Sequence, residues 1–220
     1  MNPGRRRFLA GAAALAWLPR AHAADGELWK SLRSGGLTLL MRHASTLAGL
    51  GDPPGMRLDD CSTQRNLSPE GRDEARRVGE RLKRERVPIA RVYTSPWCRC
   101  RETATLAFGR GDDWEPLSSF FDFPDREADY TERVKQRIAL LARKETRGNI
   151  VMVTHNVNVA ALTRLSIAPA EIVVVRGEGC CGFRTLGRIK LNPDGGGTGD
   201  TVPALSQVSS SSGLLRSHRS

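Results

Sequence analysis

The 220-residue sequence is poor in histidine and has no long apolar run near its start, and both shortages narrow its class. Only four histidines occur, and His22 and His218 lie in the terminal segments. The apolar stretch at residues 10–18 is too short to cross a bilayer. A zinc-finger spacing, an RNA-recognition pattern of aromatic residues and a basic amphipathic helix are all missing. The formal net charge of +10 therefore indicates a basic protein that attracts anionic ligands, and we expect no nucleic-acid partner.

Residues 1–23 have the order of an export signal. Three arginines at positions 5–7 precede the apolar stretch, and a small-x-small cleavage motif follows at 21–23. The paired arginines before Phe8 and Leu9 resemble a twin-arginine signal. We therefore expect a mature protein that begins near Ala24, works in the periplasm or as a secreted protein, and keeps no stable membrane insertion. The alternative is a short buried helix at the start of a cytosolic protein.

The remainder divides into one domain and a tail. The length suits a single ordinary domain, and residues 24–191 carry the apolar and amphipathic patterns. Residues 192–220 contain three consecutive glycines, four consecutive serines and almost no periodic apolar pattern. This composition predicts a disordered tail.

Cysteine spacing predicts one disulfide. The chain has five cysteines, and disulfides can form in the oxidising compartments that an exported protein reaches. Positions two apart on a helix do not face the same side, so Cys98 and Cys100 cannot both reach one partner. We predict a bridge from Cys61 to one of these two, while the roles of Cys180 and Cys181 stay open. A Cys-x-Cys pair with distant histidines fits no common zinc spacing, and we expect no metal.

Short apolar runs alternate with helical patterns along the domain. Strands are predicted at 37–41, 90–94, 149–154, 171–175 and 184–191. Helices are predicted after Ser68-Pro69 and Ser95-Pro96, where a hydroxyl cap precedes proline, and at 128–143 and 156–165. The alternation predicts a single-domain, three-layer α/β fold with a mostly parallel central sheet flanked by helices.

Candidate functional residues follow the ends of these strands. His43 and His155 directly follow two apolar strands, at the sheet edge where such folds bind ligands. The segment 44–67 is a long aperiodic loop rich in glycine and proline, and such loops are usually functional. Arg65 near its end is a candidate substrate contact, with surface solvation as the alternative.

Three motifs together resemble the histidine phosphatase superfamily, which includes phosphoglycerate mutases and many acid phosphatases. They are Arg42-His43-Ala44, Ser95-Pro96-x-x-Arg99-x-x-Glu102-Thr103-Ala104 and Thr154-His155. The resemblance covers roughly residues 37–175. It implies a phosphoglycerate mutase-like fold, a small phosphorylated substrate and no metal or organic cofactor. It also implies that His43 is the nucleophile, that Arg42 and Arg99 hold phosphoryl oxygens, and that His155 stabilises the transition state.

The proton donor to the leaving oxygen is less clearly marked. Asn156 stands where phytase-like relatives carry an aspartate, and an amide cannot supply the proton. Residues 115–122 also depart from the glutamate pattern of mutase-like relatives. We predict Asp122 as the acid, because the phenylalanines beside it would raise its pKa, with Glu115 as the alternative.

The sequence thus predicts an exported phosphomonoester hydrolase that acts through a phosphohistidine at His43. A phosphomutase is one alternative, and a phosphate-binding protein without turnover is another. The physiological substrate and the oligomeric state stay open.

Overall fold

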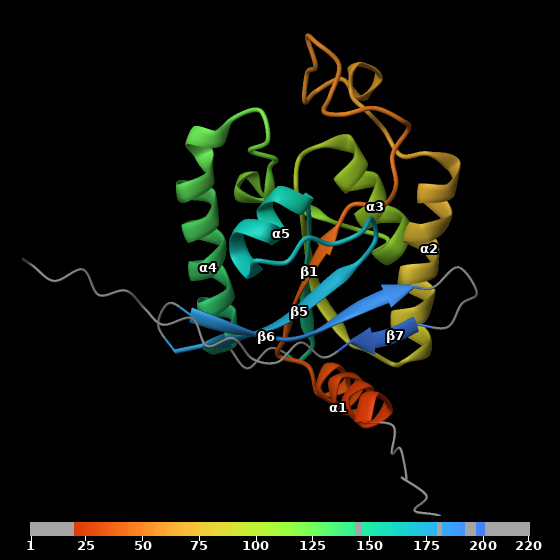
Figure 1. The fold of residues 1–220 in the computed structure, drawn as a ribbon, viewed down its shortest axis with the longest axis vertical. Helices are drawn as coiled ribbons and strands as arrows, with labels where there is room; N and C mark the ends of the chain where they lie inside the picture. Colours follow the sequence, from red (N-terminus) through yellow and green to blue (C-terminus); the bar gives the residue numbers. More distant parts are fainter. Residues whose placement is uncertain (1–19, 144–146, 180–181, 192–196, 201–220) are drawn as a thin grey trace, which may run out of the picture.

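The computed structural model describes residues 20–143, 147–179, 182–191 and 197–200 (Figure 1). The expected export signal falls on residues 1–23, of which 1–19 lie outside the described residues. Cys180, Cys181 and the tail beyond residue 200 also lie outside them. Residues 20–23 form the start of α1 (Arg20–Ser34).

A seven-stranded sheet forms the centre of the molecule, in the order β3-β2-β4-β1-β5-β6-β7 (Figure 1). Strands β1 to β4 run parallel, and β5, β6 and β7 each pair antiparallel with the preceding strand in that order. Five of the seven strands therefore share one direction. Their bounds are β1 Thr38–Arg42, β2 Ile89–Thr94, β3 Asp112–Asp113, β4 Asn149–Thr154, β5 Ile172–Glu178, β6 Gly182–Leu191 and β7 Gly197–Asp200.

Helices cover both faces of the sheet, which confirms the three-layer α/β prediction. One core joins the sheet to α1, α2 (Pro69–Arg84) and α3 (Cys98–Phe108). The other joins it to α4 (Glu127–Arg143) and α5 (Asn156–Thr163). Alternate strand residues point to opposite faces, so Leu39 and Met41 enter the first core and Leu40 the second. Short 3₁₀ helices lie at η1 Cys61–Thr63, η2 Glu115–Leu117 and η3 Pro124–Arg126.

Helix α2 starts where its sequence predicts and packs against the chain that leaves β1. The Ser68 hydroxyl accepts a hydrogen bond from Gly71 N (3.1 Å), and Pro69 occupies the first turn. A Cβ at position 71 would lie 1.9 Å from the Ser45 carbonyl oxygen. The close contact therefore requires glycine, and it fixes α2 beside the residues that follow His43.

The predicted start of α3 is wrong by two residues. Its N-cap is Trp97, which makes no side-chain cap bond, whereas Ser95 was expected as the cap. The physical reason is that Ser95 Oγ lies 2.9 Å from His155 Nε2 and is used across the sheet edge.

Three regular elements were not predicted from the sequence, the first being the two-residue strand β3 beside β2. Helix α1 was not predicted, yet it buries Leu28, Trp29 and Leu32 in the first core. Gly197–Asp200 lies within the predicted disordered tail but forms β7, because its main chain pairs with β6 without needing apolar side chains. None of the helices in the described part of the chain is long and apolar enough to span a membrane.

Candidate active site

The ends of β1 and β4 bring the two candidate histidines together. Arg42 pairs with Thr154 as the last step of the parallel ladder, and His43 N donates to the Thr154 carbonyl at 2.9 Å. The rings of His43 and His155 lie edge to face, with centroids 5.3 Å apart. Both side chains are buried, so the sheet edge presents a histidine pair shielded from solvent.

Main-chain contacts fix the protonation state of His43. Its Nδ1 lies 2.8 Å from the Ala44 carbonyl oxygen, which can only accept, so Nδ1 carries the proton. Burial lowers the pKa of His43 to about 3, with help from the charges of Arg99 and Arg42 and against the Ala44 hydrogen bond. The imidazole is therefore neutral at pH 7, and its Nε2 keeps a free lone pair. Thr103 secures this segment by accepting from Ala44 N (3.1 Å).

His155 is held from α3 and its N-terminal loop. Its Nε2 lies 2.9 Å from Ser95 Oγ and 3.5 Å from the thiol of Cys100. The Trp97 ring packs against it edge-on at 5.5 Å. Burial, followed by the charge of His43 and the nearby arginines, lowers the pKa of His155 well below its usual value. Burial also raises the pKa of Cys100 to about 12, so this sulfur is a neutral thiol.

Three arginines converge on this histidine pair. A guanidinium nitrogen of Arg42 donates to the Ile167 carbonyl (2.7 Å), and one of Arg65 donates to the Gly49 carbonyl. Arg42, Arg65 and Arg99 each lower the pKa of His43, which places all three charges near it. The Nε of each arginine is buried and has no partner among the described residues. Three buried charged donors without acceptors are costly, and together they mark a site for an anion.

Asp52 was missed by the sequence predictions. Its carboxylate accepts two contacts from one Arg99 nitrogen (2.8 and 3.0 Å), one from Trp97 Nε1 (3.1 Å) and one from Arg65 N (3.0 Å). Burial alone would raise the pKa of Asp52, but the bonds from Arg99 and Arg65 hold it below its ordinary value. An isolated aspartate in a loop without periodicity carries no sequence signal for this position.

A disulfide joins the same loop to α3. Cys61 bonds to Cys98, which confirms the prediction and selects Cys98 over Cys100. Gln64 Oε1 accepts from Cys98 N at 2.9 Å beside the bridge. Since Arg99 follows Cys98 directly, the covalent link and the Asp52 ion pair both hold the loop at the anion site.

The structure does not supply the apolar surroundings expected for Asp122. That residue is exposed, and the flanking Phe121 and Phe123 are themselves 52% and 51% exposed. Glu115 is also exposed, and it accepts from the Tyr130 hydroxyl (3.0 Å). The apolar surroundings predicted for Asp122 are therefore wrong, and its role as the acid stays a prediction.

Asn156 supports the site instead of supplying a proton. Its Oδ1 accepts from Ile167 N (2.8 Å), and the Ile167 carbonyl holds Arg42. The amide therefore anchors the turn that orients an arginine of the anion site.

The chain resembles known proteins in part of its sequence and in its fold. Residues 38–124 match the model of the histidine phosphatase superfamily, branch 1, and this segment includes Arg42, His43, Arg65 and Arg99. No curated protein sequence matches the chain. A mycobacterial glucosyl-3-phosphoglycerate phosphatase, solved with VO3, is 18% identical with a TM-score of 0.51, covering 68% of this chain and 96% of its own. A mutant phosphoserine phosphatase of Entamoeba histolytica, solved with phosphoserine, is 14% identical with a TM-score of 0.49, covering 67% of this chain and 95% of its own.

At identities of 14% and 18%, the similarity to these solved structures supports the fold alone. The mycobacterial protein shares the layered α/β architecture over most of its length. The match over residues 38–124 adds the sequence evidence, because it spans the Arg42-His43 motif and Arg99. Residues 38–124 are therefore similar in sequence to branch 1 of the histidine phosphatase superfamily, and the chain shares the layered α/β fold.

Proposed function

We propose that the protein is an exported phosphomonoester hydrolase that forms a phosphohistidine at His43. One observation carries the proposal. The free Nε2 of a neutral, buried histidine lies in a site where three arginines each leave a buried Nε–H without an acceptor. A phosphoryl group supplies both the acceptors and the electrophile that this arrangement requires.

In the first step the Nε2 lone pair of His43 attacks phosphorus, and the bond from phosphorus to the leaving oxygen breaks. Arg42, Arg99 and Arg65 bind the equatorial oxygens, whose charge is spread over the transition state. Trp97 N donates to Ser95 Oγ (3.3 Å), which leaves the Ser95 proton for His155 Nε2. This favours the His155 tautomer with a proton on Nδ1, ready to donate to a phosphoryl oxygen.

As the bond to the leaving oxygen breaks, that oxygen takes its proton from a carboxylic acid, for which Asp122 is the proposed donor and Glu115 the alternative. The second step releases phosphate. Water then gives a proton to that carboxylate and attacks phosphorus. The bond between phosphorus and His43 breaks, and the free imidazole and inorganic phosphate result.

Export is proposed on two grounds. Residues 1–23 have the pattern of a twin-arginine signal. The Cys61–Cys98 bridge is of a kind that forms and persists in oxidising compartments such as the periplasm. A fusion of residues 1–30 to a reporter, with positions 5 and 6 changed to lysine as control, tests this. Retention of the unaltered fusion in the cytoplasm would contradict export.

The activity is tested with rapid mixing of an aryl phosphate. We expect a burst of aryl alcohol equal to one site, with a phosphoenzyme that is labile to acid and stable to base. His43→Ala is expected to abolish both, and Arg91→Ala, an exposed arginine of β2, to preserve both. Tight phosphate binding without a burst would indicate a binding protein, and an isomeric phosphate ester in place of inorganic phosphate would indicate a mutase.

A further inference from the structure

Exposed large apolar side chains gather in two loops of the molecule. Six such side chains occur in the described residues, and five of them belong to the segments 44–67 and 118–126. They are Leu47 (54% exposed), Leu50 (88%), Leu58 (39%), Phe121 (52%) and Phe123 (51%). The sixth, Leu140, lies on α4. An exposed leucine or phenylalanine does not contribute the stability that its burial would give the fold. Several such side chains gathered in two loops therefore indicate a surface that binds an apolar group.

Hydrogen bonds attach both loops to residues of the anion site. In the first loop, Leu47 N donates to the Asn66 carbonyl beside Arg65, and Asp52 binds Arg99. Directly before the second loop, the Leu117 carbonyl accepts from Thr154 Oγ1 (2.6 Å), one residue before His155. The Ser118 carbonyl accepts from Asn158 (2.8 Å), three residues after it. The exposed apolar side chains therefore belong to loops that hydrogen bonds hold close to the residues around both histidines.

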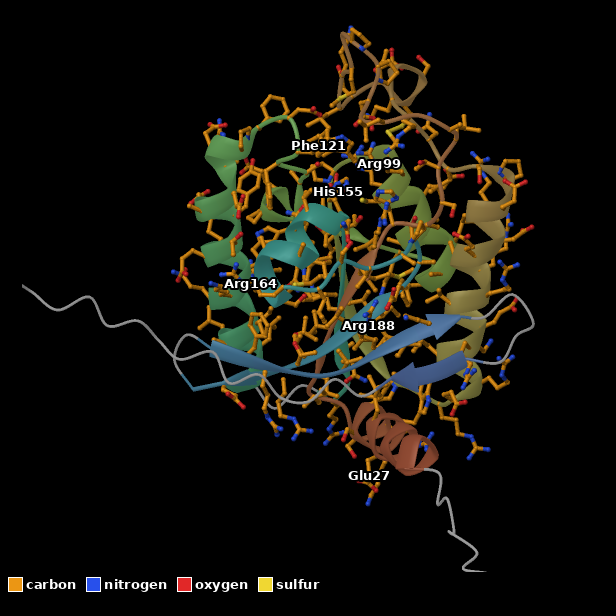
Figure 2. The ribbon with its side chains drawn as sticks, viewed as in Figure 1. Glu27, Arg99, Phe121, His155, Arg164 and Arg188 are labelled. Atoms are coloured by element: carbon orange, nitrogen blue, oxygen red, sulfur yellow. A yellow bond between two sulfur atoms is a disulfide. The ribbon has the colours of Figure 1, made fainter. Side chains whose placement is uncertain are left out.

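The figures agree with this placement. The loop 44–67 rises beyond the carboxyl end of β1, drawn in orange at the top of Figure 1. Phe121, Arg99 and His155 lie at that same end in Figure 2, whereas Glu27 of α1 lies at the opposite end. The apolar loops thus belong to the end of the molecule that carries the site.

The direction of phosphoryl transfer relates these loops to the substrate. Attacking and leaving atoms lie roughly in line across phosphorus, so the leaving oxygen points away from the nucleophile. His43 is buried at the sheet edge, and the leaving group must therefore extend outward, toward the loops. A polar leaving group such as a sugar or glycerol would contact leucine and phenylalanine side chains there without gaining binding free energy from burial of apolar surface.

We propose that the substrate is a phosphomonoester whose leaving alcohol carries an alkyl or aryl group, bound by the side chains of these two loops. The inference rests on the proposed phosphatase function. Leu50 and Phe121 contact the apolar group, while the arginines hold the phosphate.

The test is a homologous series of ethyl, butyl and hexyl phosphate with glycerol phosphate, each kept monomeric in solution. We expect kcat/KM to rise about two- to fourfold for each added CH₂, as expected for partial to full burial of a methylene. Leu50→Ser and Phe121→Ser are each expected to reduce the ratio of hexyl to ethyl phosphate at least threefold. Leu140→Ser, the matched exposed leucine on α4, is expected to keep the wild-type ratio.

Each contrary outcome has a distinct meaning. Equal kcat/KM across the series, or unchanged ratios in Leu50→Ser and Phe121→Ser, would overturn the inference while phosphate release upheld the proposed function. Release from none of the esters would overturn the proposed function as well. A preference that arises only when the esters are presented in phosphatidylglycerol vesicles would assign the loops to a membrane surface and overturn the substrate assignment.

Discussion

The two sides of the site are built in different ways. At the sheet edge, His43 is fixed through its main chain, which bonds Thr154 on β4 and Ala170 before β5. Across from it, the loop 44–67 contributes Arg65 and Asp52 and is held by an ion pair and a disulfide. Strand pairing therefore sets the position of the nucleophile, whereas the loop adds Arg65 and the carboxylate that pairs with Arg99.

Breaking the sheet-edge side is expected to have the largest effect on turnover. His155→Asn removes a donor to the phosphoryl group, and loss of one such donor costs about 10²–10³ in kcat. Cys100→Ser changes a group that contacts the same His155 nitrogen and is expected to stay within about threefold of wild type. Steady-state kinetics with one aryl phosphate compare the two variants. Equal losses in both would show that packing around His155, and not its donor, limits the rate.

Breaking the loop side is expected to cost less. Asp52→Asn places amide protons against Arg99 and removes the charge that pairs with it, so we expect kcat/KM to fall about 10- to 100-fold. Asp59→Asn is the matched control in the same loop, because Asp59 is exposed and pairs only with the exposed Arg57 in the described structure. Vanadate affinity, measured by calorimetry, should weaken in the first variant alone. Unchanged affinity in Asp52→Asn would remove this residue from the anion site.

Removing the disulfide tests what holds the loop at the anion site. The double variant Cys61→Ser with Cys98→Ser frees the loop while Asp52 remains, so we expect kcat/KM to fall about three- to tenfold. The bridge closes a separation of 37 residues, and chain entropy assigns it about 3–4 kcal/mol of the free energy of unfolding. Urea unfolding of the double variant and of the oxidised wild type measures this difference. Identical unfolding and identical kinetics would show that the ion pair alone holds the loop.

Mildly acidic pH is expected to have the smallest effect on turnover. The pKa of His43 near 3 means that mild acid does not protonate the folded nucleophile. The unfolded chain binds that proton near the ordinary value of 6.5, so the free energy of unfolding falls as pH drops from 6.5 toward 3. The expected loss is about 1.4 kcal/mol per pH unit for this histidine, and the lowered pKa of His155 adds to it.

Urea unfolding at pH 7 and pH 5 measures this slope. His43→Gln is expected to show a shallower slope than wild type, because one of the two titrating groups is gone. A pH-independent free energy of unfolding in wild type would contradict the burial of both histidines.

The sequence predicted the sheet-edge side far better than the loop side. Apolar strands that end in Arg42-His43 and in Thr154-His155 place their residues by local pattern, so the convergence of both histidines was predictable. Asp52 was not, because its role arises from a loop fold that no periodicity describes. Helix α1 was not predicted because its few apolar residues form no clear pattern by themselves and are buried only by packing against the sheet. Strand β7 was not predicted because main-chain pairing does not require a particular composition.

The parallel register of β1 and β4 has a practical consequence for the study of variants. It aligns Arg42 with Thr154 through main-chain bonds alone, and the spacing of the following histidines derives from it. Substituting a pocket side chain leaves that ladder intact. The distance between the two main chains therefore serves as an internal standard in crystal structures of variants, against which any movement of Arg99 or of the loop 44–67 can be measured.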